Sequence, residues 1–429
     1  MRVRITPSPV SGEVSAPPSK SYTHRAVILA SLAAGKSTIQ SPLISDDTLY
    51  TIDACRSLGA DIELKGNRLK INGTGGKIRV ANRQRIFVGN SGSTIRMVAP
   101  LAALGQDRVV LDGDSRLRQR PVGDLLSALQ SLGVSARSLE SNGYPPIEIQ
   151  GGKFNTGDVT ISGEVSSQHV SSLLMIAPYI KDGLRIKIAG GLHSRPYIDI
   201  TLDAMRAFGV KAANRDSYME FLVKGGQGYK ARHYQIEGDY SSAAYFFAAG
   251  AISGKPVTVK NLKADSVQGD KYLLNILSLM GCSVEYQKEK IKIFRNKELT
   301  SITVDMGDYP DIVPTVAVVT AYARGKTKIT NIGHLRFKES DRLKLTAAEL
   351  AKMGIRVDLT DNSLIIYGGK PRGAEIETHN DHRLTMSFTI AALFAEGVSI
   401  INGAEAVSKS YPQFFTDLAK LGAKIEELT

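Results

Sequence analysis

The 429-residue chain has few of the features that mark secreted, membrane or metal-binding proteins. Its only two cysteines, Cys55 and Cys282, are far apart, so neither a disulfide framework nor a cysteine metal cluster is expected. The first residues lead into no apolar segment of a signal peptide, and no apolar run is long enough to cross a bilayer. These absences favour a cytoplasmic enzyme with no membrane partner.

The chain also lacks tryptophan, an arginine-rich tail and a zinc-finger spacing, which argues against nucleic-acid binding. Its 54 basic residues outnumber the 42 acidic ones and give a net charge of +12, but they are dispersed rather than clustered. A positive field of this kind favours small anionic substrates. The length of 429 residues is enough for two or three domains, and 42% hydrophobic residues is typical of an ordinary soluble protein.

A short phrase, in which an apolar residue and a glycine follow a helical pattern and precede a strand pattern, occurs six times. The glycines recur roughly every 70 residues and are Gly59, Gly133, Gly209, Gly281, Gly354 and Gly422. Each is expected just after a helix C-terminus, in the left-handed conformation that ends the helix. The spacing indicates six copies of one structural unit.

A polar cluster that opens an apolar helix precedes each glycine phrase. The six clusters begin at Ser19, Asn90, Ser166, Tyr240, Tyr309 and Asn380. With short β runs between and after the helices, each unit is predicted to be helix–strand–helix–strand–strand. Equivalent helix N-termini are expected to face one region, where their dipoles add to the positive field.

The sixth unit has no final strand, whereas a spare alternating strand, Arg2–Thr6, precedes the first unit. We therefore predict that this strand completes the C-terminal half. Residues 1–18 and 237–429 are expected to form domain I, and residues 19–236 domain II. The chain would cross between the domains twice, which predicts hinge motion and an interdomain cleft that holds the active site.

The stretch Pro17–Arg25 is a candidate anion site. Its two prolines hold the backbone extended, and Ala26–Ala34 then predicts a buried helix that ends at Gly35. Ser19–Ser21 would lie at the helix N-terminus with free N–H groups, and Arg25 would follow one turn later. An ordinary serine cap with solvated charges is the alternative.

Other stretches also suit an anionic, hydroxylated ligand. Gly89–Arg96 offers flexible backbone, hydroxyls and an arginine, but it lacks the spacing of a nucleotide-binding P-loop. Lys338 and Arg342 are predicted to share a helix face with Glu339 beside them, so that cations bind an anion and a carboxylate transfers a proton. Helix capping or a solvated charged surface is the alternative for each. Further candidates are Arg120, Ser166–Gln168, Asp311, Asp381–Arg383 and Lys409, whereas His169 is expected to pack or to lie at the surface.

Together these motifs resemble those of the 3-phosphoshikimate 1-carboxyvinyltransferase (EPSP synthase) family of enolpyruvyl transferases. The resemblance covers the whole chain and rests on Pro18–Ser21, Gly89–Ser93, Arg120–Pro121, Val165–Gln168, Ser194–Tyr197, Pro310–Asp311, Lys338–Arg342, Asn380–Arg383 and Lys409. It implies an inside-out α/β fold of two similar domains, each of three repeated units with helices inside and sheets outside.

The resemblance implies transfer of the enolpyruvyl group of phosphoenolpyruvate to the 5-hydroxyl of shikimate 3-phosphate, with release of phosphate, in aromatic amino-acid biosynthesis. It implies a monomer that uses neither a metal nor an organic cofactor. Domain I would be mainly the phosphoenolpyruvate side and domain II mainly the shikimate 3-phosphate side.

Individual roles follow from the same resemblance. The residues implied to bind shikimate 3-phosphate are Lys20, Ser21, Arg25, Ser166, Ser167, Gln168, Ser194, Tyr197, Asp311 and Lys338. Those implied to bind phosphoenolpyruvate are Lys20, Gly92, Arg120, Gln168, Arg342, Arg383 and Lys409. Asp311 and Lys20 would serve the hydroxyl, while Glu339 and Lys20 are both candidates for the methylene proton.

Three positions depart from the family pattern, because His334, Ser93 and Met97 stand where many relatives have Asn, Thr and Pro. We assign no ligand role to His334. The other two flank the phosphoenolpyruvate region, where glyphosate competes in the family, so inhibitor sensitivity stays open although Gly92 leaves room for the inhibitor.

Two alternative functions are a related enzyme and a protein without catalytic activity. The related UDP-N-acetylglucosamine enolpyruvyl transferase typically has Lys-Asn in place of Lys20–Ser21 and often a reactive loop cysteine, whereas both cysteines here fall in repeated helix-to-strand segments. A non-enzymatic anion-binding protein would not require Asp311 and Glu339 among its cations.

Overall fold

Six four-stranded sheets of one topology recur along residues 1–80 and 84–428, which the computed structural model describes. In each sheet, the two strands at one side run parallel, and the other neighbouring pairs run antiparallel. A helix connects the parallel strands along the chain wherever a repeat is continuous, as in β6-α3-β7-α4-β8-β9. Each repeat thus has one strand more than the sequence predicted. These additional strands are only three to five residues long, too short to show a clear alternation.

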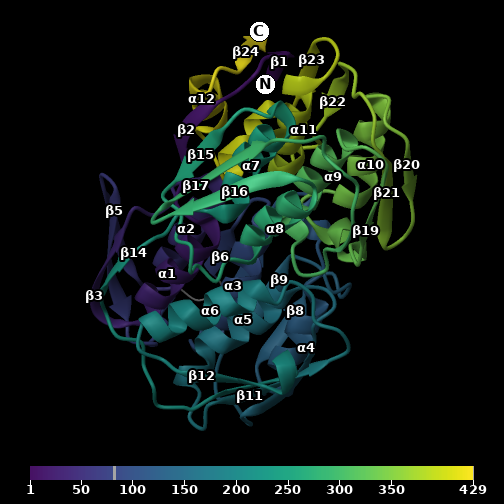
Figure 1. Cartoon of the computed structure of the whole chain (residues 1–429). Helices are drawn as coiled ribbons and strands as arrows, with labels where there is room; N and C mark the ends of the chain where they lie inside the picture. Colours follow the sequence, from purple (N-terminus) through teal and green to yellow (C-terminus); the bar gives the residue numbers. More distant parts are fainter. Residues whose placement is uncertain (81–83, 429) are drawn as a thin grey trace. The chain divides into compact units, whose positions relative to one another are not determined.

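The chain divides into two compact units, and unit 2 comprises Pro18–Ile236. Its helices are α1 (Lys20–Leu32), α2 (Asp46–Ser57), α3 (Gly92–Ala102), α4 (Gly123–Ser131), α5 (Ser167–Ile176) and α6 (Pro196–Ala207). Its strands are β3 (Ala34–Gln40), β4 (Asp61–Lys65), β5 (Arg68–Thr74), β6 (Gln84–Phe87), β7 (Arg108–Asp112), β8 (Ser135–Ser138), β9 (Ile147–Gln150), β10 (Asp158–Ser162), β11 (Leu184–Ala189), β12 (Ala212–Arg215), β13 (Glu220–Val223) and β14 (His233–Gln235). Figure 1 labels the helices α1–α6 of this unit. Its sheets have the orders β14-β3-β5-β4, β6-β7-β9-β8 and β10-β11-β13-β12.

Unit 1 comprises Met1–Pro17 and Glu237–Thr429. Its helices are α7 (Tyr240–Ser253), α8 (Tyr272–Leu279), α9 (Val313–Ala321), α10 (Arg342–Lys352), α11 (His382–Phe394) and α12 (Phe414–Lys420). Its strands are β1 (Arg2–Thr6), β2 (Gly12–Ser15), β15 (Val257–Lys260), β16 (Cys282–Gln287), β17 (Lys290–Arg295), β18 (Thr303–Asp305), β19 (Lys326–Thr330), β20 (Val357–Leu359), β21 (Ser363–Tyr367), β22 (Glu375–Glu377), β23 (Ser399–Asn402) and β24 (Lys424–Leu428). The sheets have the orders β2-β15-β17-β16, β18-β19-β21-β20 and β22-β23-β1-β24.

Distant parts of the sequence complete two sheets in unit 1 and one in unit 2, and in unit 1 β2 pairs in parallel with β15. The N-terminal strand β1 lies between β23 and β24 and is antiparallel to both. In unit 2, β14 pairs in parallel with β3. Within unit 1, the two segments that lead to and from unit 2 are hydrogen-bonded, since Asp239 N donates to Pro17 O at 2.8 Å.

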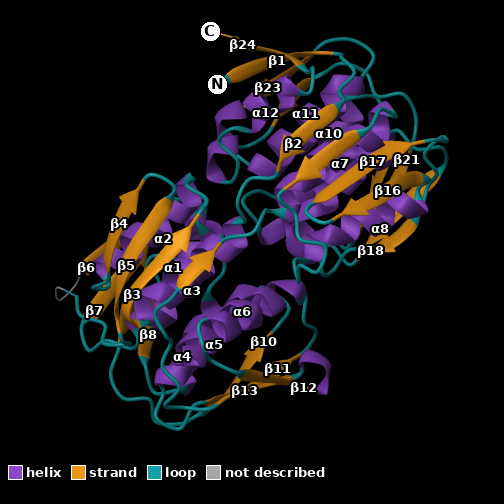
Figure 2. Ribbon diagram, turned by 60° about the vertical axis from the view of Figure 1, so that its left-hand side comes forward, coloured by secondary structure: helices purple, strands orange, loops and turns teal. Residues whose placement is uncertain are grey.

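In each unit, helices form the centre and the sheets lie outside them (Figure 2). All nine residues of α9 are buried, as are nearly all of α1, α7 and α11, so these helices are buried around their whole circumference. The strands instead alternate, and β11 buries every second side chain. The predicted fold class is therefore confirmed. No helix of residues 1–80 and 84–428 is long and apolar enough to span a membrane.

The six repeated glycines all have the positive φ that the sequence predicted. Their φ angles run from 80° at Gly354 to 104° at Gly281 and Gly422. Each lies two residues after the end of the second helix in its repeat, where the chain turns towards the next strand. The recurring phrase thus marks one backbone turn that all repeats share.

The first helix ends differently from the prediction. It stops at Leu32, and Ala33 has an extended backbone with ψ 154°, so no glycine ends it. Gly35 instead lies in β3 opposite Gly73 of β5. A Cβ on Gly73 would lie only 2.2 Å from Ala33 O, so the glycine there allows β5 to approach the end of the helix.

Replacing Gly281 by alanine is expected to lower the free energy of unfolding by about 1–2 kcal/mol, because an L side chain is strained at positive φ. The new Cβ would meet Glu298 O at 3.5 Å, an ordinary contact, so the backbone angle alone carries the effect. Gly369 is the matched control, since its Cβ would meet Ile355 Cδ1 at 3.5 Å and its φ lies outside the left-handed range. Urea unfolding should show Gly369→Ala unchanged or slightly stabilised, and equal effects would contradict the prediction.

Candidate active site

The N-termini of the helices in the middle of unit 2 converge, and hydrogen bonds between their first turns show this directly. Gln168 Nε2 at the start of α5 donates to Ser93 Oγ at the start of α3, at 2.8 Å. Thr94 Oγ1 of α3 donates to Asp47 O at the start of α2, at 3.3 Å. Lys20, the first residue of α1, also contacts Asp47. Because helix N-termini carry partial positive charge, this end of unit 2 favours anions.

Lys20 is held at this end by a largely buried ion pair. Its Nζ lies 3.1 Å from Asp47 Oδ2, and the two side chains are only 11% and 7% exposed. Since each charge depends on the other once water is excluded, Asp47 fixes the ammonium at the start of α1. The sequence analysis did not identify Asp47. The missed signal was Ser45–Thr48, a serine cap followed by two acidic residues at a helix start.

Arg25 is buried one turn further along α1 and is surrounded by neutral acceptors. Its Nε donates to Thr201 Oγ1 at 2.7 Å, and its Nη1 and Nη2 donate to the carbonyls of Ser21 and Tyr197 at 2.9 and 2.8 Å. Burial lowers the pKa of Arg25 to about 10. A buried guanidinium held by neutral groups favours the arrival of an anion that balances its charge.

Arg120 lies against the first turn of α3. It is 3% exposed, and its Nη1 donates to Asn90 O at 3.1 Å. A Cβ on Gly92 would lie 2.4 Å from Arg120 Cζ. Any side chain at position 92 would therefore overlap the guanidinium in its present position. Arg96 follows one turn later, and its Nη1 donates to Gln168 Oε1 at 3.2 Å. Arg96 of α3 and Gln168 of α5 are thereby brought near the connection before α4 that carries Arg120, since Arg96 Nη2 also donates to Pro121 O at 3.2 Å.

Serine hydroxyls surround the start of α5. Ser166 caps the helix by accepting from Gln168 N at 3.3 Å, and Ser167 is buried behind it. Ser194 is also buried and has φ +59°, two residues before α6. His169 is wholly buried, and desolvation, followed by the nearby Arg96, holds its pKa well below the usual value. A neutral, packed imidazole fits the expectation that His169 is not a ligand.

Unit 1 builds its polar cluster around one buried guanidinium, that of Arg342, which is 1% exposed. Its nitrogens donate to Asp311 Oδ1 at 2.9 Å, to Glu339 Oε2 at 2.5 Å and to Asp381 Oδ2 at 2.8 Å. Burial by itself would lower the pKa of Arg342, but the three carboxylates outweigh it and raise that pKa above its usual range. Arg342 therefore holds together the starts of α9, α10 and α11.

Asp381 is the most deeply buried carboxylate that contacts Arg342. It is fully buried and accepts from Ser340 Oγ at 2.8 Å and from Arg383 N at 2.9 Å, in addition to Arg342. Asp311 differs, because its side chain is 21% exposed and it bridges Arg342 and Arg383. Its Oδ2 accepts from Arg383 Nη2 at 2.8 Å. Lys409 adds a further cation, whose Nζ donates to Asn380 O at 2.7 Å.

The predicted helix through Lys338–Arg342 is wrong in its first turn. The helix α10 begins only at Arg342, and Lys338 has an extended backbone at the end of a short 3-10 helix, Gly333–Phe337. Asp341 sets this start, because its Oδ1 accepts from Lys344 N at 3.0 Å. Lys338 and Arg342 therefore do not share a helix face, although Glu339 does contact Arg342.

The structure thus places the sequence-predicted residues in two groups. Those of unit 2 lie at or near the starts of α1, α3, α5 and α6 and are Lys20, Ser21, Arg25, Gly92, Arg120, Ser166, Ser167, Gln168, Ser194 and Tyr197. Those of unit 1 lie at or near the starts of α9, α10 and α11 or just after β23, and are Asp311, Lys338, Glu339, Arg342, Arg383 and Lys409.

Neither cysteine resembles a reactive nucleophile. Cys55 is buried in α2 and Cys282 at the start of β16. Burial raises the pKa of Cys55 to about 12 and that of Cys282 to about 11, so both thiols stay protonated at neutral pH. Among residues 1–80 and 84–428, no group of three or more His, Cys, Asp or Glu side chains is arranged to hold a metal ion.

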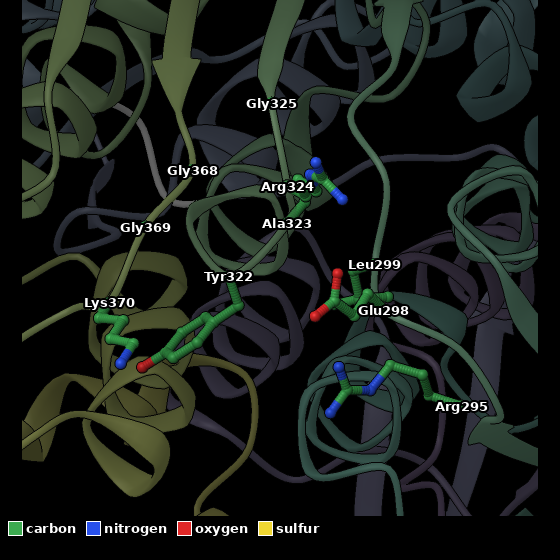
Figure 3. Close-up of a pocket in the computed structure, with 10 residues that line it drawn as sticks. All are labelled: Arg295, Glu298, Leu299, Tyr322, Ala323, Arg324, Gly325, Gly368, Gly369 and Lys370. Atoms are coloured by element: carbon green, nitrogen blue, oxygen red, sulfur yellow. The ribbon is translucent and has the colours of Figure 1, made fainter.

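A separate hollow of about 460 Å³ lies at the other end of α9 (Figure 3). Tyr322, which directly follows the helix, lines it together with Arg295, Arg324 and Lys370. Nine helical residues span about 13 Å, and Asp311 precedes their N-terminus. The hollow is therefore distinct from the Arg342 cluster.

Comparison with known proteins gives one consistent family. The family model described as EPSP synthase (3-phosphoshikimate 1-carboxyvinyltransferase) matches residues 5–418. The chain is 45% identical to the 3-phosphoshikimate 1-carboxyvinyltransferase of Methanocaldococcus jannaschii, over 97% of both chains, and 43% identical to that of Methanocella arvoryzae, over 99% and 100%. A solved EPSP synthase from Acinetobacter baumannii is similar with a TM-score of 0.82 and 27% identity, over 99% of this chain and 100% of that one.

Proposed function

The chain belongs to the EPSP synthase family, and from this premise we propose that it transfers the enolpyruvyl group of phosphoenolpyruvate to the 5-hydroxyl of shikimate 3-phosphate. The products are 5-enolpyruvylshikimate 3-phosphate and phosphate, in the shikimate pathway to the aromatic amino acids. The observation that carries this proposal at the level of residues is the Arg342 cluster, in which two arginines meet the carboxylates of Asp311 and Glu339.

We assign the binding of phosphoenolpyruvate to cations of both units. Arg342, Arg383 and Lys409 in unit 1, with Arg120 beside Gly92 in unit 2, supply the guanidinium and ammonium donors that a carboxylate and a phosphate require. In the free protein, Asp311 and Glu339 neutralise Arg342. An incoming anion would replace them there, which would free two carboxylates for proton transfer.

Shikimate 3-phosphate carries a phosphate, a carboxylate and two free hydroxyls, and the polar groups of unit 2 match this set. Arg25 supplies a buried positive charge, while Ser21, Ser166, Ser167 and Ser194 supply hydroxyls. Tyr197 packs near them, and Lys20 and Gln168 contact both substrates. Lys338 and Asp311 of unit 1 complete the proposed set, with Asp311 directed to the 5-hydroxyl.

The reaction proceeds by addition and then elimination. The 5-hydroxyl oxygen attacks C2 of phosphoenolpyruvate, its proton passes to Asp311 or Lys20, and C3 accepts a proton from Glu339 or Lys20. The tetrahedral ketal that results then loses phosphate and one C3 proton, which restores the double bond. The arginines stabilise charge on phosphate and carboxylate throughout, and the acid and base groups lower the cost of each proton transfer.

One chain supplies every proposed ligand, and both substrates are small anionic metabolites. We therefore propose a monomer as the active form and the cytoplasm as its location. Sedimentation of the purified chain with both substrates would test the first point, and a dimer formed only in their presence would contradict it.

Release of inorganic phosphate tests the function directly. The purified chain should release phosphate when shikimate 3-phosphate and phosphoenolpyruvate are both present, and release none when either is left out. UDP-N-acetylglucosamine in place of shikimate 3-phosphate should give no phosphate. Turnover with the UDP-sugar alone would assign the chain to the other enolpyruvyl transfer, and silence with both acceptors would leave only anion binding.

Substituting Lys20 by methionine should separate its chemical role from its structural one. The single variant leaves the buried Asp47 carboxylate without its cation, so it should lose stability by about 3 kcal/mol as well as activity. The double variant Lys20→Met, Asp47→Asn removes both charges and should regain most of the stability. Its kcat should nevertheless stay at least about 100-fold below that of the unaltered chain, since acid–base catalysis is lost.

Thermal unfolding and steady-state kinetics of the two variants make this test. A double variant that is stable and also recovers kcat would remove Lys20 from the chemistry. A double variant that recovers kcat but has a raised KM would reduce Lys20 to a binding residue.

Substituting Gly92 by alanine should raise the KM for phosphoenolpyruvate about tenfold or more, a loss of about 1.4 kcal/mol. The added methyl would meet the Arg120 guanidinium at 2.4–2.7 Å and displace it. The KM for shikimate 3-phosphate should stay unchanged. Gly152→Ala is the control, because a Cβ there meets nothing within 4 Å. Equal effects on both KM values would show a general distortion of unit 2 instead.

A further inference from the structure

Unit 1 contains one more buried carboxyl group beside the Arg342 cluster, that of Asp270. It lies in a short 3-10 helix, Gly269–Lys271, that precedes α8, and it is only 4% exposed. Its Oδ2 accepts a short hydrogen bond from Ser241 Oγ, in the first turn of α7. Neither the motifs nor the proposed reaction gives this group a role.

The segment that carries Asp270 is held rigidly against the start of α7. Gln268 Oε1 accepts from Tyr240 N at 3.1 Å, and its Nε2 donates to Gly238 O at 2.8 Å and to Glu237 Oε1 at 2.6 Å. On the other side of Asp270, the Lys271 ammonium donates to Ser266 O at 2.5 Å. Asp270 therefore has a fixed place with little freedom to turn towards water.

Several charged groups face Asp270 from the neighbouring elements. Arg383 at the start of α11 is near, because its Nη1 donates to Tyr245 Oη, one turn after Ser241 on α7, at 3.3 Å, and its Nη2 donates to Asp311 Oδ2 at 2.8 Å. Asp311, in the 3-10 helix Pro310–Ile312, and Asp239, just before α7, add negative charge. Burial above all, then Asp311 and Asp239, raise the pKa of Asp270 to about 7, against the opposing effects of Ser241 and Arg383. Burial and the negative charges of Asp311 and Asp239 both disfavour the ionised form of Asp270, so its carboxyl group retains a proton more readily than an exposed aspartate does.

The two carboxyl groups differ in their partners. Asp311 accepts from Arg342 at 2.9 Å and from Arg383 at 2.8 Å, and both of these donors are cations. Asp270 accepts from a neutral hydroxyl. Of the two carboxyl groups, Asp270 is therefore the one that holds a proton, and Asp311 remains the anion.

On the premise of the proposed function, we propose that Asp270 is a positioning residue for phosphoenolpyruvate binding and for the base Asp311. In its neutral form it leaves Asp311 ionised and leaves the positive charge of Arg383 to the substrate. When Asp270 loses its proton, a second negative charge appears beside Arg383 and weakens the attraction for the anionic substrate. Asp270 thereby sets the alkaline side of the pH range in which the site binds phosphoenolpyruvate.

The test is the pH dependence of kcat/KM for phosphoenolpyruvate at saturating shikimate 3-phosphate. In the unaltered chain, kcat/KM should fall about tenfold between about pH 6 and pH 8.5, the effect of one added charge in a partly screened site. In Asp270→Asn, an uncharged side chain of the same shape that still accepts from Ser241, this decline should be absent. Ionisation of the substrates themselves is common to all variants and cancels in the comparison.

Two further variants sharpen the test. Ser241→Ala removes the hydrogen bond that favours the ionised form of Asp270, so the decline should move to higher pH. Asp265→Asn removes the same charge from an exposed side chain of the same connection and should follow the unaltered chain. A profile of Asp270→Asn that runs parallel to that of the unaltered chain, at any level, would show a merely structural role and overturn the proposal.

Infrared difference spectra of the chain without substrates give a readout that does not depend on turnover. The C=O stretch of a protonated carboxyl group should be present at about pH 6, lost by about pH 8.5, and absent from Asp270→Asn. If the chain releases no phosphate, the proposed function fails, and this band still decides whether Asp270 holds the proton. The absence of this band at pH 6 would overturn the inference. So would a band that titrates as expected while Asp270→Asn and the unaltered chain have the same pH dependence of kcat/KM.

Discussion

The buried helices at the centre of each unit impose the constraint on which the rest of the structure depends. Because α7, α9 and α11 are buried around their whole circumference, sheets cover them on the outside and charged side chains are confined to their ends. Hydrogen bonds such as Gln168 to Ser93 show that helix N-termini share one end. Fold and anion binding therefore have one cause, since the same packing that buries the helices gathers their positive ends.

The buried guanidinium groups near these helix starts have different partners in the two units when no substrate is bound. In unit 1, Arg342 is neutralised by Asp311, Glu339 and Asp381, two of which are proposed to act on protons. In unit 2, Arg25 is held by a hydroxyl and two carbonyls. An anionic substrate that binds Arg342 in unit 1 would thus displace carboxylates from it. An anionic substrate that binds Arg25 in unit 2 would instead neutralise a charge that has no carboxylate partner among its hydrogen bonds named above.

Much of the fold was predictable because the repeat is a local signal. The phrase around Gly281 recurs since each repeat needs a positive φ at the same turn, and the observed angles confirm it. The short strands such as β18 were missed because three residues show no period. The start of α10 was misplaced because a run of charges resembles a helical face, whereas the Asp341 cap begins the helix only after it.

The sequence by itself determined the repeat, the family and the identity of the polar residues at each helix start, because all of these depend on short motifs and on their spacing along the chain. Only the tertiary structure decided which charges meet. The partner of Lys20 proved to be Asp47 from the next helix, and Arg120 rests where any side chain at position 92 would collide with it. Such pairings join residues far apart in the chain and depend on how the helices pack, which no local pattern records.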